Sequence, residues 1–267
     1  MNNKFGIEYH LVDSCNLRCA GCSHYSSLLD DLSYTPLEKV QKELQLLKNK
    51  TDDGNHLYWL RLLGGEPLLH PCLSQCIEEI RGLFPHTRIT LVTNGLLLDK
   101  MDSDFYNVCS RCKIVIQVTD YYILNIQDVF NHLKEKKVEV ELYRTCKTWS
   151  YQNIRITNEY VDCFKNCYHK TMCPNYRNEK IYLCPQMAYV YIFNKFFNKE
   201  IPILDNEYID INNIGSFEEL YNTFINLHPQ FCSTFCNCRG EDGNPLLGGK
   251  RRRTLKDINE FCLCTNK

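Results

Sequence analysis

The first 145 residues alternate between two kinds of segment, and this alternation limits the folds that the chain can adopt. Short runs rich in leucine, β-branched and aromatic residues have the length of strands, and segments with helical spacing separate them. The five expected strands are Gly6 to Val12, Leu57 to Leu63, Arg88 to Thr93, Lys113 to Thr119 and Val138 to Arg144. Regular β-α order predicts parallel strands with right-handed crossovers, in an open doubly wound sheet or a full or partial barrel.

Helices are expected between these strands. Thr35-Pro-Leu-Glu38 has the pattern of a capping box with proline at the first helical position. A second helix is expected from about residue 71 to 83, and residues 102–110 and 125–137 predict two more. Ligands collect at the carboxyl ends of parallel strands, so functional residues are expected directly after each strand.

The sequence changes character after about residue 146, where cysteine, asparagine and tyrosine become frequent. We therefore expect a core over residues 1–148 and a cysteine-rich module with a basic tail over residues 149–267. Within the module, the segment from Cys173 to Cys184 predicts a hairpin, and Phe217 to Leu227 predicts a helix.

Composition excludes several classes of protein. Apolar residues make up 44% of the 267 residues, which is typical of a globular protein, and 31 basic residues nearly balance 32 acidic ones. No nucleic-acid partner is expected from that balance. The N-terminus lacks the apolar stretch of a secretory signal, and no run is long enough to span a membrane, so we expect a cytoplasmic protein. Its 17 cysteines are then ligands, catalytic thiols or buried small residues rather than disulfides.

Three cysteines follow the first strand within eight residues, as Cys15-Asn-Leu-Arg-Cys19-Ala-Gly-Cys22. Thiolates are soft ligands that suit iron–sulfur clusters, zinc or copper. Three on one loop leave a four-ligand site one protein ligand short. A four-iron cluster would then keep one iron open for a small molecule, whereas a structural zinc site would need a fourth donor.

Two further motifs end the next two strands. Gly64-Gly65-Glu66-Pro67 follows the second strand and Thr93-Asn94-Gly95 follows the third. Glycines let a backbone approach a ligand closely, and the glutamate and nearby carbonyls supply acceptors for an ammonium group. In a parallel fold both motifs share one rim with the cysteine loop.

With these motifs the sequence resembles the radical S-adenosylmethionine (radical SAM) superfamily. The resemblance covers roughly the first half of the chain and implies a partial (β/α)6 TIM-like barrel. It further implies a 4Fe-4S cluster on Cys15, Cys19 and Cys22, whose open iron chelates S-adenosylmethionine. Gly64, Gly65 and Glu66 would receive the methionyl ammonium.

The same resemblance suggests further cofactor contacts by position. Gln117 and Thr119, near the end of the fourth strand, would meet the ribose. Gly21 stands where family members usually carry an aromatic residue, so His24 and Tyr25 are the nearest substitutes beside the adenine, or else pack under the loop.

The second half resembles SPASM and twitch auxiliary-cluster domains. Cys173 and Cys184 flank a hairpin whose usual turn glycine is replaced by Glu179, and Asn178 is expected to take the positive φ there. A second cluster would draw its four thiols from a larger set: Cys173, Cys184, Cys232, Cys236 and Cys238, with Cys167 as the alternate. A structural zinc knuckle is the competing interpretation.

The other cysteines are expected to pack as small hydrophobic residues: Cys72, Cys76, Cys109, Cys112 and Cys146. Cys163, Cys262 and Cys264 stay unassigned. Substrate contacts are expected from polar residues near the same rim: Asp120, Tyr121, Arg144 and Lys147.

Three functional hypotheses follow. In the first, the protein cleaves S-adenosylmethionine reductively to a 5′-deoxyadenosyl radical. The radical abstracts a hydrogen atom from a small polar molecule such as a sugar, aminocyclitol or nucleotide-linked metabolite, and flavodoxin or ferredoxin supplies the electron. In the second, the substrate is a ribosomally made peptide. In the third, the chain is a zinc-stabilised binding scaffold without enzymatic activity.

Overall fold

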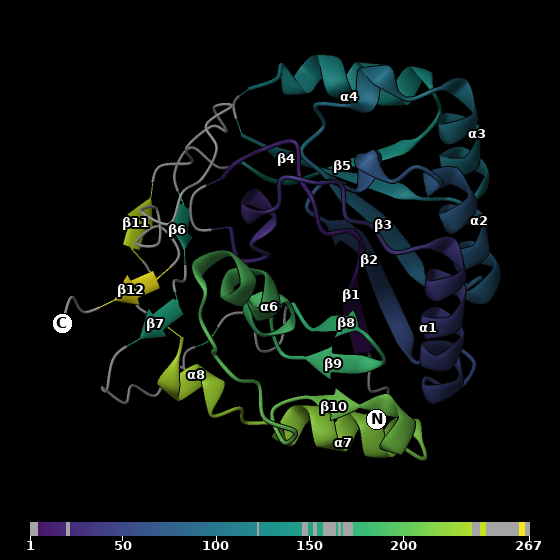
Figure 1. Ribbon diagram of the computed structural model, residues 1–267. Helices are drawn as coiled ribbons and strands as arrows, with labels where there is room; N and C mark the ends of the chain where they lie inside the picture. Colours follow the sequence, from purple (N-terminus) through teal and green to yellow (C-terminus); the bar gives the residue numbers. More distant parts are fainter. Residues whose placement is uncertain are drawn as a thin grey trace.

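The computed structural model describes residues 5–19, 22–121, 123–145, 149–151, 154–156, 164, 167, 173–236, 241–243 and 262–264. An eight-stranded sheet with the order β10-β9-β8-β1-β2-β3-β4-β5 forms its centre (Figure 1). The strands are β1 (Phe5–Val12), β2 (Leu57–Gly64), β3 (Arg88–Thr93), β4 (Val115–Asp120), β5 (Glu139–Thr145), β8 (Asn175–Arg177), β9 (Lys180–Tyr182) and β10 (Ile209–Asp210). Strands β1 to β5 and β8 are parallel, and β9 and β10 continue the sheet in antiparallel pairs.

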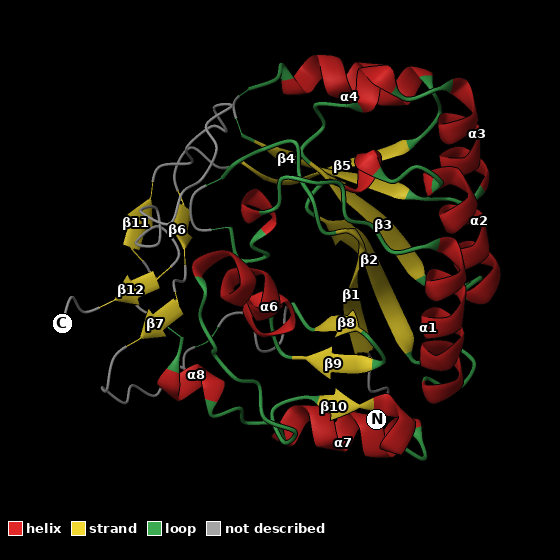
Figure 2. Cartoon of the chain, in the orientation of Figure 1, coloured by secondary structure: helices red, strands yellow, loops and turns green. Residues whose placement is uncertain are grey.

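Helices lie on both faces of this sheet (Figure 2). The outer face carries α1 (Leu37–Lys50), α2 (Leu73–Leu83), α3 (Ser103–Arg111) and α4 (Ile126–Glu135). The inner face carries α6 (Pro185–Phe197), which contacts β8, β9 and the short helix η1 (Ser26–Leu28). The remaining elements are η2 (Pro67–Leu69), η3 (Leu98–Lys100), η4 (Ile211–Asn213), α7 (Phe217–Asn226), α8 (Phe231–Thr234), and the strand pairs β6 (Trp149–Tyr151) with β11 (Glu241–Gly243) and β7 (Ile154–Ile156) with β12 (Cys262–Cys264).

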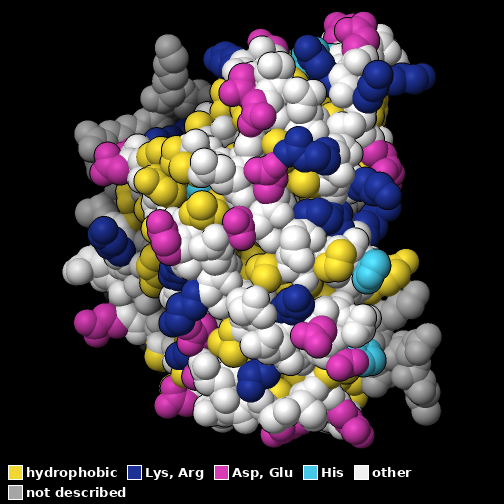
Figure 3. Space-filling view, turned by 90° about the vertical axis from the view of Figure 1, so that its right-hand side faces the viewer, with side chains coloured by type: hydrophobic (Ala, Val, Ile, Leu, Met, Phe, Trp, Pro, Cys, Tyr) yellow, Lys and Arg dark blue, Asp and Glu magenta, His cyan; other side chains and the backbone are white. Residues whose placement is uncertain are grey.

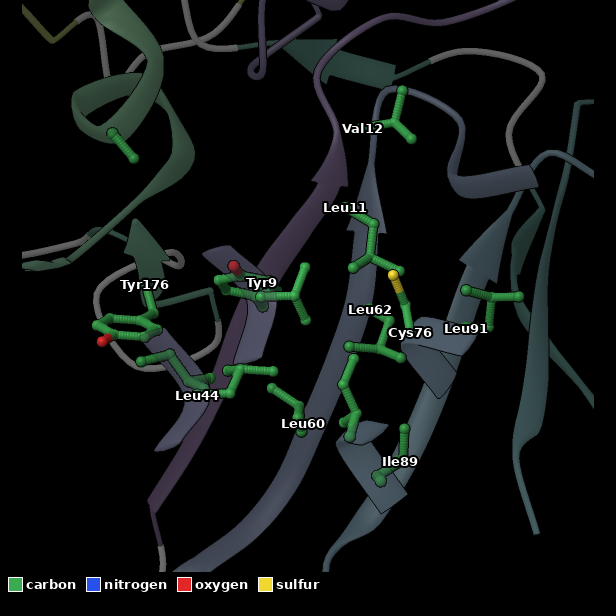
Figure 4. Close-up of a cluster of buried hydrophobic side chains, with 14 of the residues drawn as sticks. Tyr9, Leu11, Val12, Leu44, Leu60, Leu62, Cys76, Ile89, Leu91 and Tyr176 are labelled. Carbon is green, nitrogen blue, oxygen red and sulfur yellow. The ribbon is translucent and has the colours of Figure 1, made fainter. Parts of the chain in front are cut away.

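The main core lies between the sheet and its outer helices. Alternate residues of β1, β2 and β3 point toward α1 and α2, where they meet Leu44 and Cys76 (Figure 4). Tyr9 and Tyr176 extend this core to the neighbouring strand β8, with ring centroids 6.0 Å apart. Since strand side chains alternate, the residues between these core positions face the inner side of the sheet.

The expected α/β partial-barrel class is confirmed, and each expected strand lies within two residues of an observed one. The sixth parallel strand differs from a simple six-unit barrel, however. It is β8, which pairs with the free edge of β1 through Glu8 and Tyr9 rather than with β5. The first strand of the chain therefore lies inside the sheet.

The predicted capping box at the start of α1 is wrong. Pro36 is the N-cap residue and makes no side-chain cap hydrogen bond. The Thr35 hydroxyl donates instead to the carbonyl oxygen of His10, at 3.0 Å. This bond ties the approach to α1 to β1, so a tertiary contact replaces the local cap.

The predicted hairpin is present as β8 and β9, and Asn178 has the expected positive φ of 50°. Glu179 also lies in the left-handed region, with φ 61°. Positive φ at both central residues matches the twist of the two strands in a tight hairpin. Sequence patterns did not predict α6. Most of its residues are buried, and a helix that is apolar nearly all round has no clear polar face to reveal it.

A buried ion pair fastens the hairpin and α6 to the end of β1. The Arg177 guanidinium donates to both Asp13 carboxylate oxygens, at 2.9 and 3.1 Å. The Tyr191 hydroxyl of α6 donates to the same carboxylate at 2.8 Å and accepts from Arg177 at 2.6 Å. Burial pushes the pKa of Asp13 upward, but the His10 hydrogen bond and the Arg177 charge outweigh it and lower that pKa.

The helix-covered face shows no large region of one charge. Lysine and arginine side chains are interspersed there with aspartate and glutamate (Figure 3). This pattern agrees with the near-zero net charge of the sequence. Among the described residues, no helix is long and apolar enough to cross a membrane.

Replacing Arg177 with methionine is expected to destabilise the fold by about 3–5 kcal/mol, because the Asp13 charge is then buried without its partner. The matched control is Arg111→Met, which breaks an exposed pair with Glu78 and is expected to cost less than about 1 kcal/mol. Thermal unfolding of the anaerobically purified variants measures both. Equal losses in the two variants would contradict the role of the buried pair.

Candidate functional site

The cysteine loop leaves the carboxyl end of β1 and lies on the rim of the sheet. Cys15, Cys19 and Cys22 are all partly buried. Burial is the largest cause that raises the pKa of the Cys15 thiol, followed by the Glu66 carboxylate and then by Cys22 and Cys19. The three thiols are therefore close enough to interact electrostatically.

Gly64 and Gly65 bring the end of β2 against the backbone of this loop. The Gly65 amide donates to the Val12 carbonyl at 2.8 Å, and the Glu66 amide donates to the Ser14 carbonyl at 2.9 Å. A Cβ atom on Gly64 would lie 1.8 Å from the Val12 oxygen, and one on Gly65 would lie 2.1 Å from the Ser14 oxygen. Only glycine fits at either position. The space that these glycines leave is filled by the cysteine loop itself.

The Glu66 side chain is fully buried and ties the end of β2 to the end of β3. Its carboxylate accepts from the Thr93 hydroxyl at 2.7 Å, the Asn94 amide at 2.9 Å and the Leu68 amide at 3.1 Å. Burial raises the pKa of Glu66 to about 7, although these three donors oppose the shift. Pro67 begins η2 directly after it.

Asn94 connects the third strand to the cysteine loop. Its side-chain amide donates to Asn16 Oδ1 at 2.7 Å and lies 3.9 Å from Cys15 Sγ. The Cys15 sulfur also accepts from the Leu17 amide at 3.3 Å. Gly95 takes a φ of 79°, which turns the chain sharply after Asn94. The structure thus brings together all three motifs that the sequence singled out.

The donor set of this loop, three thiols with N–H donors beside them, suits an iron–sulfur cluster. Among the described residues, no group of three or more His, Cys, Asp or Glu side chains is close enough to hold a metal ion. A four-iron cluster holds its thiolates farther apart than one ion does, and N–H donors to cysteine sulfur are typical of such sites. The three thiols are partly buried, and the Leu17 amide and the Asn94 side-chain amide both donate toward Cys15 Sγ.

His24 and Tyr25 lie under the cysteine loop, against α6. Tyr25 is buried, with its ring centroid 5.7 Å from that of Phe193. His24 lies 4.7 Å from the His10 ring, which stacks on Tyr189 of α6 at 3.8 Å. Both residues therefore pack between the loop and the helix, while Gly21 lies outside the described residues.

The candidates on β4 and β5 lie at different depths. Thr119 and Asp120 end β4, and Tyr121 follows it, so these three share the rim with the cysteine loop. Gln117 lies deeper, where its amide nitrogen donates to Glu141 at 3.0 Å. Arg144 pairs with Thr119 through the backbone of β5, and its side chain is not among those described. Lys147 lies outside the described residues.

Several cysteines of the second half gather near α6. The pKa of the buried Cys184 thiol is raised by burial first and also by Cys232 and Cys167, so these three thiols are neighbours. Cys236 is buried, 3.9 Å from Gln186. The Cys173 thiol instead donates a hydrogen bond to Glu8. Cys238 lies outside the described residues, as do Cys146 and Cys163.

The structure separates the remaining cysteines by burial. Cys76, Cys109 and Cys112 are buried in the core, as expected. Cys72 is exposed at the start of α2, so its predicted role as a small core residue is wrong. It lies at the N-cap, outside the helical face that carries Cys76 into the core.

Polar residues on the inner face of the sheet were not predicted as site residues. Glu8 of β1 pairs with Arg61 of β2 at 3.4 Å, and both are largely buried. Burial raises the pKa of Glu8 to about 7, against the opposing charge of Arg61. The sequence does carry a signal that could have identified these two residues. Glu8 and Arg61 are charged residues within strands that are otherwise mostly apolar.

Comparisons with known proteins agree with this site. The family described as "4Fe-4S single cluster domain" matches residues 7–137. A GTP 3',8-cyclase of Trichodesmium erythraeum is 34% identical over 128 residues, which are 47% of this chain and 38% of that protein. A GTP 3',8-cyclase of Thermodesulfovibrio yellowstonii is 31% identical over 139 residues, which are 49% of this chain and 42% of that protein. The matched part of the chain thus spans less than half the length of these relatives.

A crystal structure of BtrN in complex with AdoMet and 2-DOIA has a TM-score of 0.47 over 83% of this chain and 84% of BtrN, at 14% identity. The family match covers most of β1, strands β2 to β4, the cysteine loop and the two glycine-containing motifs that meet at its rim. These matches, over just under half of the chain, support its assignment as a radical S-adenosylmethionine enzyme.

Proposed function

We propose that this protein cleaves S-adenosylmethionine reductively and uses the resulting radical to abstract hydrogen from a small polar substrate. The observation that carries the proposal is the junction of the cysteine loop with the ends of β2 and β3, where Asn94 and Leu17 both donate toward Cys15. When bound, a 4Fe-4S cluster with S-adenosylmethionine supplies the radical chemistry. An electron donor such as flavodoxin or ferredoxin would supply the electron.

The chain's own residues hold and shield this chemistry. Cys15, Cys19 and Cys22 would bind three irons. Glu66 is positioned by its three hydrogen bonds, so its main role is to keep β2, β3 and the loop in register. The backbone carbonyls beside Gly64 and Gly65 remain the proposed acceptors for the methionyl ammonium.

Gln117 keeps its proposed place beside the ribose. Its carbonyl oxygen Oε1 is buried, and within the described part of the chain it has no hydrogen-bond partner. Its amide nitrogen is already bound to Glu141, which fixes the direction of that oxygen. Ribose hydroxyls are donors that would satisfy it.

A second cluster is proposed for the cysteines near α6. The neighbouring thiols of Cys167, Cys184 and Cys232 favour Cys167 over Cys173 as a ligand, because Cys173 bonds to Glu8. Cys236 follows Cys232 by four residues and is the proposed fourth ligand. Such a cluster would lie beside α6 and could anchor substrate or accept an electron.

Replacing Cys15, Cys19 or Cys22 with alanine is expected to abolish cleavage of S-adenosylmethionine, since each substitution removes one cluster ligand. The reduced, anaerobically reconstituted variants are assayed for 5′-deoxyadenosine. Cys109→Ala is the control, because that thiol is buried in the core and should leave the cleavage intact. Persistent cleavage in all three loop variants would refute the proposal.

Gly65→Ala is expected to lower the iron content and the cleavage rate at least about tenfold, because its Cβ would overlap the Ser14 carbonyl at the start of the loop. Gly82→Ala is the matched control. A Cβ there meets nothing within 4 Å, and alanine is favoured over glycine inside a helix. Iron analysis and 5′-deoxyadenosine formation compare the two, and similar values would contradict the close-packing argument.

The reconstituted protein is expected to hold about eight irons and about eight sulfides, as two four-iron clusters require. Cys184→Ala should reduce both numbers to about four, and Cys167→Ala should do the same, whereas Cys173→Ala should retain them. Metal and sulfide analysis makes the comparison. Zinc in place of iron at the second site would favour a structural knuckle.

A further inference from the structure

A row of buried polar side chains crosses the inner face of the sheet at one level. Asn175 of β8 lies beside Glu8 of β1, Glu8 lies beside Arg61 of β2, and Arg61 lies beside Thr90 of β3. These positions alternate with the outward-facing core residues of β1, β2 and β3 in Figure 4, so their side chains point inward. Four consecutive strands thus contribute one polar side chain each.

Two polar atoms in this row have no partner. Thr90 Oγ1 and Asn175 Oδ1 are buried, and neither has a hydrogen-bond partner in the described residues. Thr90 is 2% exposed and Asn175 is 0% exposed. The Asn175 amide nitrogen donates to Glu8 at 3.2 Å and to the Cys173 carbonyl at 2.8 Å. These two bonds fix the side chain, so its oxygen Oδ1 points away from both acceptors. Buried polar atoms are nearly always paired with protein groups or ordered water, so these two atoms mark positions where a polar group of a ligand, or water, would bind.

The charges in the row limit which partner fits. Glu8 and Arg61 neutralise one another at 3.4 Å. The rings of Trp59 and Tyr143 also cover the Arg61 guanidinium, 4.5 and 5.3 Å from it. When Glu8 is ionised, these four residues together carry no net charge that would attract a phosphate. Asn175 Oδ1 can only accept a hydrogen bond, and the Thr90 hydroxyl can accept or donate one, so the fitting ligand brings hydroxyl or amino groups.

The depth of the row separates it from the cluster loop. Thr90 precedes the end of β3 by three residues, and Glu8 precedes the end of β1 by four. At about 3.3 Å per residue, the row lies roughly 10–13 Å from the rim that carries the cysteines. That position lies beneath the rim and on the same inner face as Gln117.

We propose that Thr90 and Asn175 are specificity-determining residues that hydrogen-bond a polyhydroxylated or amino-bearing small molecule. The inference rests on the proposed radical function and names the class of its substrate. Asn175 comes from the hairpin of the cysteine-rich half, so that half contributes directly to substrate recognition.

Thr90→Val tests the proposal, because valine keeps the shape of the side chain and removes only the hydroxyl. Without ligand, its thermal midpoint is expected to equal or exceed that of the wild type, since an unpaired buried hydroxyl is lost. Thr51→Val is the control. The Thr51 hydroxyl donates to the Leu47 carbonyl at 2.8 Å, so this variant should be less stable.

Binding is measured on the reconstituted protein with S-adenosylmethionine and no reductant, using glucosamine, myo-inositol and GTP as separate probes. Glucosamine or myo-inositol is expected to bind. Thr90→Val should weaken that binding roughly 3- to 10-fold, the effect of one lost hydrogen bond. The Thr90→Ser and Thr51→Val variants should each bind the probe with an affinity within about twofold of that of the wild type. Both keep a hydroxyl group at position 90.

Three results would overturn the inference: binding of neither donor-rich probe, unchanged binding by Thr90→Val, or a strong loss of stability in that variant without ligand. Tight binding of GTP alone would assign the site to a nucleotide instead. Formation of 5′-deoxyadenosine by the wild type without any probe is followed separately. Its absence would refute the radical function, while its presence with failed probe binding would refute only the substrate class.

Discussion

The candidate site depends on the close approach of two backbone segments. Gly64 and Gly65 lie on one side of this contact, and Val12 and Ser14 lie on the other. It sets where the cysteine loop leaves the sheet. Glu66 then extends the contact sideways, because its buried carboxylate gathers donors from the neighbouring strand. The Asn94 side chain at the end of β3 then donates a hydrogen bond to Asn16 of the cysteine loop. Three strand ends are thereby fixed relative to one another.

Much of this arrangement follows from local sequence patterns. The strands and the outer helices have clear periodicities, and the three motifs follow their strands directly, so a parallel fold brings them together. The chemical role of the residues was harder to predict. The glycines and the glutamate predict contacts with a ligand, and the structure shows in addition that the Glu66 carboxylate joins the ends of β2 and β3. Close backbone packing and close ligand approach both require glycine, so the sequence alone does not distinguish them.

Features that depend on distant contacts were not predictable in the same way. The Thr35 hydroxyl prefers a carbonyl of β1 to its local cap, and β8 pairs with a strand more than 160 residues earlier. The helix α6 carries almost no polar stripe because it is enclosed by the sheet, the loop and the hairpin. The inward row of Glu8, Arg61, Thr90 and Asn175 forms only when four strands are placed in register. Each of these depends on tertiary structure that no short window contains.

The position of β1 inside the sheet has a consequence for how the chain folds during synthesis. One edge of β1 pairs with β2 early, but the other edge has no partner until residues 175–177 have left the ribosome. An unpaired edge of an apolar strand is a template for association between chains. The nascent N-terminal half is therefore exposed to aggregation over the interval in which more than half of the protein is made. Arrival of the hairpin closes that edge and places Arg177 on Asp13 in the same step.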